Sequence, residues 1–391
     1  SETFQRCYLN NDKTESFFLN LINNETLNLS RYTYFYLSFL VEKKRIDEVK
    51  KITNEIEFIN SPLLLSQGKD WIDKGEFYKF NEIFSCKNRN DLIGEFLFLI
   101  SNLYSSQDDF EKSNYYINLS NFSNPKFTFN LSLIAENYYL DENYPQTKKI
   151  LKKFSKNENF YYWYRLKKEA QIIAKQKNNE QSLKYLVNKF KEIKKPNEKF
   201  IFDIANFYKN SKKYNDAINN YTKIIDNYEI SSLIKSDLLY RRGGCFERMG
   251  DYIKADKDLL TSLKLNPDDA YVLNYLAYSW LERDYKINEA IEMLETAYEF
   301  EKDDPYIIDS IGWAYFLIED YTKAERLLKR AVELMPDDPI VNDHYGDILW
   351  KLNRKIQARY FWINTLQMDG ADEEMLDKIN FKIINGLKKS L

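Results

Sequence analysis

The chain has 391 residues, which is longer than a single compact core usually extends, so we expect several domains or one elongated array of repeats. Hydrophobic residues make up 44% and charged residues 30%, and only 10 Gly and 8 Pro are present. This composition excludes a disordered chain and disfavours a β-sandwich, because both classes use more turn-forming residues. The chain is therefore predicted to be mainly helical.

Charge is distributed unevenly, although the formal net charge is only −3. Residues 141–213 carry 19 basic and 8 acidic side chains, whereas residues 251–347 carry 10 basic and 23 acidic ones. The lysines of the basic stretch are scattered over predicted outer helix faces and lack the Arg and Gly patterns of RNA-binding modules. We therefore expect no nucleic-acid partner.

Cysteines and apolar runs give two further expectations. Cys7, Cys86 and Cys245 are odd in number and far apart, so neither a disulfide framework nor a thiolate zinc site is predicted. No run of about 18 apolar residues exists, so the chain is not expected to span a membrane.

The N-terminal half, residues 1–231, shows a weak period of about 34 residues, typical of paired helices. Residues 12–29 are expected to form one helix. Degenerate helix pairs are then predicted near residues 30–60, 61–94, 94–127, 128–161, 163–196 and 198–231.

The period becomes regular over residues 236–372, where Ala290, Ala324 and Ala358 are 34 residues apart. Four units are predicted, at 236–269, 270–304, 305–338 and 339–372. Two antiparallel helices pack closely only where one side chain is small, and Gly312 and Ala324 would supply those small surfaces. Pro336 would end the third unit.

Residues 373–391 are predicted to form a capping helix that covers the last apolar layer of the array. One face of this amphipathic helix carries Met375, Ile379, Ile383 and Leu387, which follow the helical period.

The pattern of a large residue, a Gly or Ala, an aromatic, an Ala and a final Pro resembles the tetratricopeptide repeat. The resemblance implies an all-α solenoid, a right-handed superhelix of antiparallel helix pairs. A narrower resemblance is carried by NPDDAYVLNYLAYSWLERD, DPYIIDSIGWAYFLIEDYTKAERLLKRAVELMPDDP and VNDHYGDILWKLNRKIQARYFW. These segments are similar to the C-terminal repeats of exported proteobacterial proteins, among them an outer-membrane lipoprotein that is the adaptor of a periplasmic processing protease. This implies a bacterial scaffold in the periplasm or at the outer membrane, with a cytoplasmic location as the alternative.

Residues that could support catalysis are scarce. His344 is the only histidine, so metal sites, Ser-His-Asp triads and Cys-His pairs would all have to share it. We predict His344 to be a partly packed surface side chain. Gly243, Gly244 and Gly250 lie in a helical context and lack the Lys-Ser/Thr of a phosphate-binding loop. We expect no enzyme activity, no metal and no cofactor.

A groove is predicted along the first helices of the four regular units, whose outward positions follow from helical spacing. Asn274, Asp309 and Asp343 occupy the same position in successive units, beside a row of rings with Trp313 near the middle. The predicted partner-binding residues are Tyr240, Asn274, Tyr278, Asp309, Trp313, Phe316, Asp343 and Trp350.

Two interpretations of the groove remain. These side chains could bind one another and cover the junctions between helix layers, or they could hold a partner protein or peptide, with Trp313 as the anchor. Asn and Asp stand where chaperone-binding relatives use Lys and Asn to grip a carboxylate, so an acidic tail is not expected as the ligand. The expected function is a non-enzymatic interaction scaffold or adaptor. The alternative is a structural protein that self-associates through its oppositely charged segments.

Overall fold

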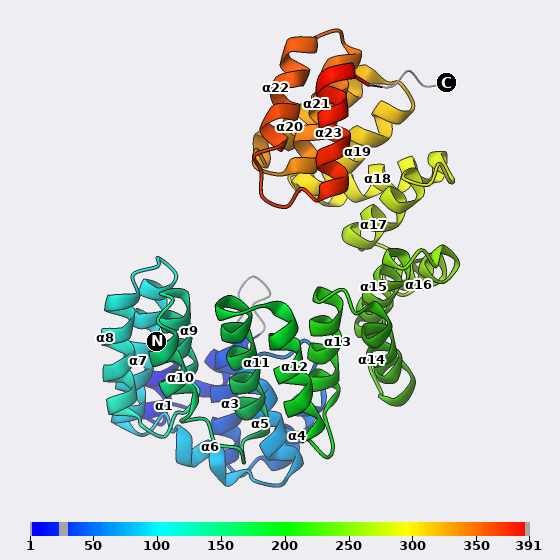
Figure 1. Cartoon of the computed structure of the whole chain (residues 1–391). Coiled ribbons are helices and arrows are strands. Elements are labelled where there is room, and N and C mark those ends of the chain that lie inside the picture. The colour runs from blue at the N-terminus through cyan, green and yellow to red at the C-terminus, as the bar shows by residue number, and fades with distance from the viewer. Residues whose placement is uncertain (1, 23–29, 388–391) are drawn as a thin grey trace. The chain divides into compact units, whose positions relative to one another are not determined.

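The computed structural model describes residues 2–22 and 30–387, and within those ranges it contains 23 helices and no strand (Figure 1). The expectation of an all-α chain is confirmed. The chain divides into two compact units, Ser1–Tyr228 and Glu229–Leu391, which we call unit 1 and unit 2 and describe separately. None of the helices in the described ranges is long and apolar enough to cross a lipid bilayer.

The described residues of unit 1 form 14 helices. They are α1 (Glu2–Tyr8), α2 (Thr14–Ile22), α3 (Ser30–Glu42), α4 (Ile46–Asn54), α5 (Leu63–Asp73), α6 (Tyr78–Ile83), α7 (Arg89–Ser105), α8 (Phe110–Ser123), α9 (Asn130–Leu140), α10 (Tyr144–Leu151), α11 (Asn159–Gln176), α12 (Asn179–Lys191), α13 (Glu198–Asn210) and α14 (Tyr214–Asn227). The helix expected over 12–29 is present as α2, and residues 23–29 lie outside the described residues.

The first helices of unit 1 do not stack in simple chain order, because α5 packs against α11 and α3 packs against α5 and α6. Gln67 on α5 accepts hydrogen bonds at Oε1 from the backbone N–H groups of Phe160 and Tyr161 on α11, at 2.9 and 3.3 Å. Lys199 on α13 donates from Nζ to the carbonyl groups of residues 58, 59 and 61. These contacts join segments that are far apart in the sequence, so unit 1 departs from a strictly linear array.

A disulfide joins Cys7 at the end of α1 to Cys86, which lies between α6 and α7, and the two Cα atoms are 5.8 Å apart. Cys245 is buried and takes no part in this disulfide. The expectation that the cysteines form no disulfide is therefore wrong. The large separation of the two cysteines in the sequence did not indicate their distance in the fold, because α1 packs into the same aromatic core as the segment around Phe84.

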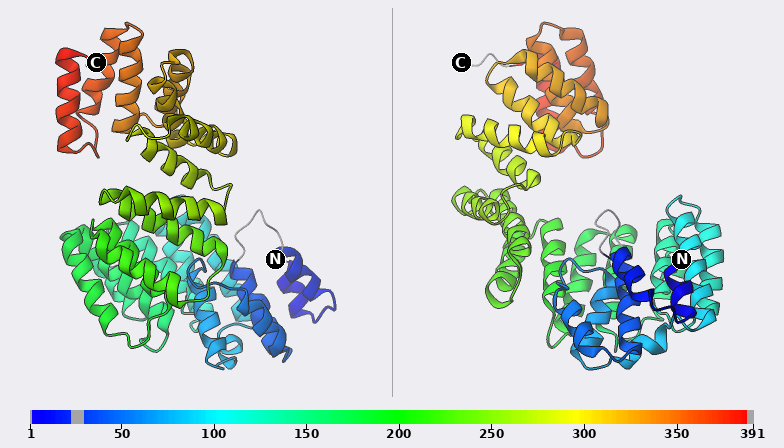
Figure 2. Two further views of the ribbon diagram at one scale, coloured as in Figure 1. Left: turned by 90° about the vertical axis from the view of Figure 1, so that its right-hand side faces the viewer. Right: turned by 180° about the vertical axis from the view of Figure 1, so that it is seen from behind.

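Unit 2 contains the regular part of the array, in which antiparallel pairs follow one another in chain order (Figures 1 and 2). Its helices are α15 (Ser232–Arg248), α16 (Tyr252–Leu265), α17 (Ala270–Leu281), α18 (Ile287–Phe300), α19 (Pro305–Leu317), α20 (Tyr321–Leu334), α21 (Pro339–Lys351), α22 (Lys355–Thr365) and α23 (Glu373–Asn385). The final helix, α23, packs against α22 and buries Ile379.

Glycines set the close approach of the two helices in three of the four pairs. A Cβ atom on Gly312 would lie 2.9 Å from Cγ of Leu328 on α20, and one on Gly243 would lie 3.0 Å from Cγ of Leu259 on α16. A Cβ atom on Gly346 would collide with the indole of Trp362 on α22. The predicted role of Gly312 at a close helix crossing is confirmed.

Aspartates begin the first helix in three of the four pairs, at α17, α19 and α21, in the same way. The side chains of Asp269, Asp304 and Asp338 each accept hydrogen bonds from the second and third backbone N–H groups that follow. Such caps satisfy amide groups that have no partner inside the helix, and a negative charge is favourable at a helix N-terminus. Asp320 likewise caps α20, where its side chain accepts from the backbone N–H of Lys323.

We predict that Gly346→Ala destabilises unit 2 by about 1–3 kcal/mol, because the added methyl group would overpack a closed helix crossing. Trp362 cannot easily move away, since it is fully buried and its Nε1 donates to Asp347 at 3.0 Å. Thermal unfolding followed by circular dichroism measures the loss.

Gly244→Ala is the matched control. It also lies inside a helix, but its Cβ would meet only the Tyr275 side chain, at 3.4 Å from the hydroxyl oxygen and farther from the ring, which are ordinary contacts. We expect Gly244→Ala to be neutral or to stabilise by up to about 1 kcal/mol through helix propensity. Equal melting temperatures for the two variants would contradict the assigned crossing.

A second prediction concerns the disulfide. Peptide mapping of the oxidised protein should recover a fragment in which Cys7 is linked to Cys86. Reduction should destabilise unit 1 by about 2–4 kcal/mol, because the cross-link restricts the unfolded chain. Cys7→Ser should lower the stability of the oxidised protein and remove its response to reductant. A reductant effect of the same size in Cys7→Ser would contradict this assignment.

Candidate functional site

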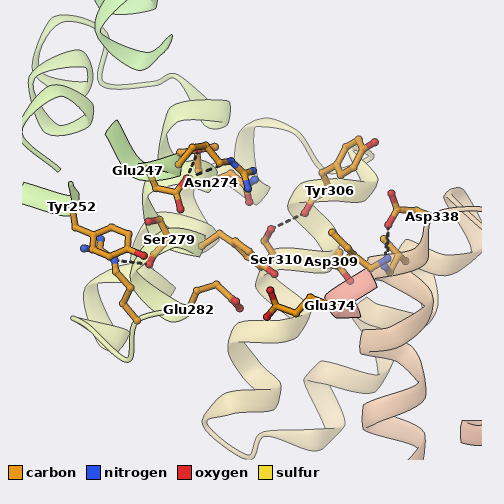
Figure 3. A pocket seen from close by; sticks show the side chains of 16 residues that line it. Glu247, Tyr252, Asn274, Ser279, Glu282, Tyr306, Asp309, Ser310, Asp338 and Glu374 are labelled. Carbon is orange, nitrogen blue, oxygen red and sulfur yellow. Dashed lines mark hydrogen bonds and ion pairs between the residues drawn. The ribbon is translucent and has the colours of Figure 1, made fainter. Parts of the chain in front are cut away.

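Unit 2 carries a surface cavity of about 650 Å³ along the first helices of successive pairs, which we call the C-terminal cavity (Figure 3). Its walls come from α15, α17 and α19, from the starts of α16, α21 and α23, and from the residues that follow α17. The lining residues are Glu247, Arg248, Tyr252, Asn274, Tyr275, Tyr278, Ser279, Glu282, Arg283, Tyr306, Asp309, Ser310, Asp338, Ile340, Val341 and Glu374.

Acidic groups outnumber basic ones in this wall, with five carboxylates and two guanidinium groups. Both guanidinium groups already have acidic neighbours. Arg283 Nη2 lies 2.8 Å from Asp256 Oδ1 outside the cavity, and Arg248 Nε lies 3.5 Å from Glu247 Oε2. The cavity is therefore acidic as a whole.

Asp309 is the most deeply placed acid of the wall, with 4% of its surface exposed. Its Oδ2 lies 2.8 Å from Nδ1 of His344, whereas its Oδ1 is buried and has no hydrogen-bond partner among the described residues. Leaving a buried acceptor unpaired costs about 1–3 kcal/mol, and more when it is charged. Asp309 thus retains an unused capacity to accept a hydrogen bond.

His344 is buried at 6% exposure, so the prediction of a partly packed surface histidine is wrong. Burial alone would lower its pKa, but the charge of Asp309 and the hydrogen bond to it, with Asp343 and Asp347 nearby, raise the pKa overall. The sequence could not reveal this partner, because Asp309 belongs to the preceding helix pair.

Trp313 does not line the cavity. Its ring stacks on His344 with centroids 4.2 Å apart and on Phe316 with centroids 4.8 Å apart. Its Nε1 is buried without a hydrogen-bond partner in the described part of the chain. The ring packs on His344, and the role of Trp313 as the anchor of a partner stays a prediction. Phe316 belongs to the same stack.

Asn274 and Tyr278, both on α17, are the two other predicted residues that line the cavity. Asn274 Oδ1 is buried and has no hydrogen-bond partner within the described ranges, like Asp309 Oδ1 one helix pair later. Burial, followed by the nearby charges of Glu282 and Asp309, raises the pKa of Tyr278, so its hydroxyl group stays protonated and can donate.

Asp343 and Trp350 contact the C-terminal segment that contains α23 and do not line the cavity. Lys382 Nζ on α23 lies 2.7 Å from Asp343 Oδ1 and 2.8 Å from Asp347 Oδ2. Trp350 packs against Trp362, and a Cβ atom on Gly386 would collide with its ring. The polar row predicted from the sequence is therefore divided, with Asn274 and Asp309 in the cavity and Asp343 under the capping helix.

Tyr240 also lies outside the lining residues and packs edge to face against Tyr275, with centroids 5.6 Å apart. The sequence analysis missed Tyr275, Tyr306 and Glu374 as lining residues. Tyr275 directly follows Asn274 in the sequence. A prediction that counted a wider face of this helix as facing the groove would have included Tyr275. Tyr306 and Glu374 project from helix starts, which a search along one stripe of each helix does not reach.

Comparisons with known proteins agree with the repeat period. Residues 236–269, which are one of the predicted units, match the family model described as tetratricopeptide repeat. The TPR repeat-containing protein PA4667 of Pseudomonas aeruginosa is 35% identical over 111 residues, which are 28% of this chain and 19% of that protein. Anaphase-promoting complex subunit 3 of Schizosaccharomyces pombe is 24% identical over 119 residues, 30% of this chain and 16% of that protein. The chain thus spans about a fifth or less of the length of these relatives.

Among solved structures, a tetratricopeptide repeat protein from Parabacteroides merdae superposes with a TM-score of 0.52 at 16% identity. The match covers 66% of this chain and 99% of that one, and shows a shared fold. The stacked helix pairs and the cavity along their first helices define an α-solenoid. The chain is a tetratricopeptide-repeat protein. Proteins of this class are generally non-catalytic scaffolds for protein interactions.

The buried charges around α21 predict a pH dependence of stability. Burial and the neighbouring Asp343 raise the pKa of Asp347 to about 7, against the effect of Lys382. The pKa values of His344 and Asp347 are both above their ordinary values of 6.5 and 3.8, so both protonated forms favour the folded state. The unfolding free energy of unit 2 should therefore fall as the pH rises from about 5 to about 8.

Urea unfolding followed by Trp fluorescence at a series of pH values measures this slope. Asp347→Asn is the control, because it keeps an oxygen to accept from Trp362 Nε1 while removing one titrating group. The slope should be shallower in this variant. Stability that rises between pH 5 and pH 8 in the wild-type protein would contradict the assigned charge cluster.

Proposed function

We propose that this chain is a non-enzymatic scaffold that binds an exposed segment of a partner protein in the C-terminal cavity. The observation that carries the proposal is a pair of buried oxygens on two neighbouring first helices, Asp309 Oδ1 and Asn274 Oδ1. Neither has a hydrogen-bond partner among the residues that the structure describes. Both accept hydrogen bonds, and a bound chain can supply the missing donors through its backbone or side chains.

The tyrosines of the cavity support the same proposal. Tyr252, Tyr275, Tyr278 and Tyr306 present rings of low conformational entropy with a polar tip, a type of side chain enriched where proteins bind one another. The cavity runs across several helix pairs, and its volume lies within the range of about 300–1,000 Å³ that is usual for binding sites.

The Cys7–Cys86 disulfide bears on the compartment in which the scaffold works. Disulfides persist in oxidising compartments such as the bacterial periplasm and are rare in the cytosol. Together with the resemblance of residues 266–366 to exported proteobacterial repeat proteins, the disulfide supports a place in the bacterial envelope. There the chain would act as an adaptor, for instance one that presents substrates to a processing protease.

Self-association is the second candidate function, and the segregation of charge favours it. Residues 141–213 carry a net charge of +11 and residues 251–347 a net charge of −13, so two copies could attract each other. Attraction of this kind between exposed charges would weaken steeply with salt, since the Debye length is only about 8 Å at physiological ionic strength.

Quantitative affinity capture with the full chain tests the first proposal. The immobilised wild-type protein, Tyr278→Ala and Tyr360→Ala are each exposed to the same extract, and retained proteins are quantified by mass spectrometry. Tyr278 lines the cavity, whereas Tyr360 is exposed on α22 outside it. Loss of a central aromatic contact costs about 2 kcal/mol or more, which is about thirtyfold in affinity.

A specific partner should be retained by the wild type and by Tyr360→Ala but lost from Tyr278→Ala. Circular dichroism verifies that Tyr278→Ala is folded. Retention of the same proteins by a folded Tyr278→Ala variant would contradict the proposal. Recovery of the chain itself as the main retained protein, with a salt-dependent mass by light scattering, would support self-association instead.

A further inference from the structure

The charge and the hydrogen-bonding capacity of the C-terminal cavity narrow the chemistry of its occupant. The wall contains five carboxylates, and its two guanidinium groups already have acidic neighbours in Asp256 and Glu247. An acidic segment or a nucleic-acid backbone would meet repulsion from this wall. A positively charged segment would be attracted to these carboxylates.

The two acceptors without a partner among the described residues, Asp309 Oδ1 and Asn274 Oδ1, also favour a positively charged occupant. Asp309 is more than nine-tenths buried, and its Oδ1 has no partner among the described residues, because His344 contacts the other oxygen. An ammonium or guanidinium group donates hydrogen bonds and cannot accept them, and it neutralises a carboxylate as well. A lysine or arginine side chain therefore both donates a hydrogen bond to Asp309 and neutralises its charge, whereas a neutral donor supplies only the hydrogen bond.

The aromatic walls suit the rest of such a side chain. The aliphatic stem of lysine or arginine packs against apolar surface while its charged end reaches a polar group, and a cation is attracted to the face of an aromatic ring. Within this cavity Arg283 already lies over the ring of Tyr252, with its Cζ 4.5 Å from the centroid. Tyr278, on the helix beside α19, and Tyr306, on α19 itself, offer further rings near Asp309.

We propose that the segment bound in the C-terminal cavity carries a lysine or arginine whose cationic group donates to Asp309 Oδ1, an inference that rests on the proposed function of unit 2. The occupant is an extended, basic segment of a partner protein. The cavity is larger than one such side chain requires, so residues on both sides of the basic one enter it and meet Asn274 and the tyrosines.

Fluorescence anisotropy with the full chain and three labelled peptide pools tests the proposal. Each pool has seven residues with a fixed centre and degenerate flanks, and the centre is lysine, norleucine or glutamate. Norleucine keeps the length of the lysine stem but lacks the charge. The lysine pool should bind the wild type at least about tenfold more tightly than the norleucine pool, the difference expected of one hydrogen bond to a charged group, and the glutamate pool should bind least.

Asp309→Asn is the decisive variant, because it removes the charge and preserves the shape. It should weaken binding of the lysine pool by about tenfold or more and leave the norleucine pool unchanged. Asp303→Asn is the matched control, since it removes the same charge from a site that is 89% exposed and outside the cavity. It should leave binding of all three pools unchanged.

Equal binding of the lysine and norleucine pools, equal effects of Asp309→Asn and Asp303→Asn, or no binding of any pool would overturn the proposal. A second copy of this chain is another basic occupant, through residues 141–213. It would be revealed by salt-dependent self-association that Asp309→Asn abolishes, and that result would also overturn the proposal. If Tyr278→Ala loses the partner in affinity capture but the wild-type chain binds the norleucine or glutamate pool best, only the basic occupant is refuted. If a folded Tyr278→Ala variant retains the partner, the proposed function itself is refuted.

Discussion

The close crossing of the two helices within each pair is the constraint on which the rest of unit 2 depends. Gly243, Gly312 and Gly346 each face a large residue 16 positions later on the second helix, where a Cβ atom would crowd or collide with it. The repeated crossing brings the two helices close together in these three pairs. Asn274 and Asp309, which occupy equivalent positions in successive units, therefore lie in one cavity wall. Packing between small and large residues thus arranges polar groups that are not themselves part of the apolar core.

The end of the array shows how the same positions acquire different roles. Asp343 continues the row of Asn274 and Asp309, but α23 supplies Lys382, which forms ion pairs with Asp343 and Asp347. A buried carboxylate left unpaired is costly, and breaking such a pair typically costs about 3–5 kcal/mol. The capping helix therefore satisfies the last acids of the row, whereas Asp309 Oδ1 remains without a partner in the described residues. This contrast within one structure supports the proposal that the cavity binds a partner.

Much of the fold could be predicted from the sequence, because its repeat rests on local spacing. The period around Gly312, Ala324 and Pro336 predicts the helix pair α19–α20, and α20 ends at Leu334, just before the proline. Contacts between segments that are far apart carry no such period. The packing of α5 on α11 and the Cys7–Cys86 bond therefore could not be derived from spacing. Three of the predicted groove residues line the cavity, whereas the others contact neighbouring rings or the C-terminal segment, contacts that helical spacing alone does not predict. The burial of His344 depends on Asp309 from the preceding pair, which only the three-dimensional arrangement reveals.

Site-specific photo-crosslinking tests most directly whether the cavity is the surface that holds a partner. A photoreactive phenylalanine derivative replaces either Tyr306, which lines the cavity and is 58% exposed, or Tyr360, which lies outside it on α22 and is 61% exposed. The two positions thus offer the same accessibility and differ in location. The account predicts that a captured partner crosslinks at position 306 and not at position 360. Crosslinking at position 360 alone, or equally at both positions, would contradict it.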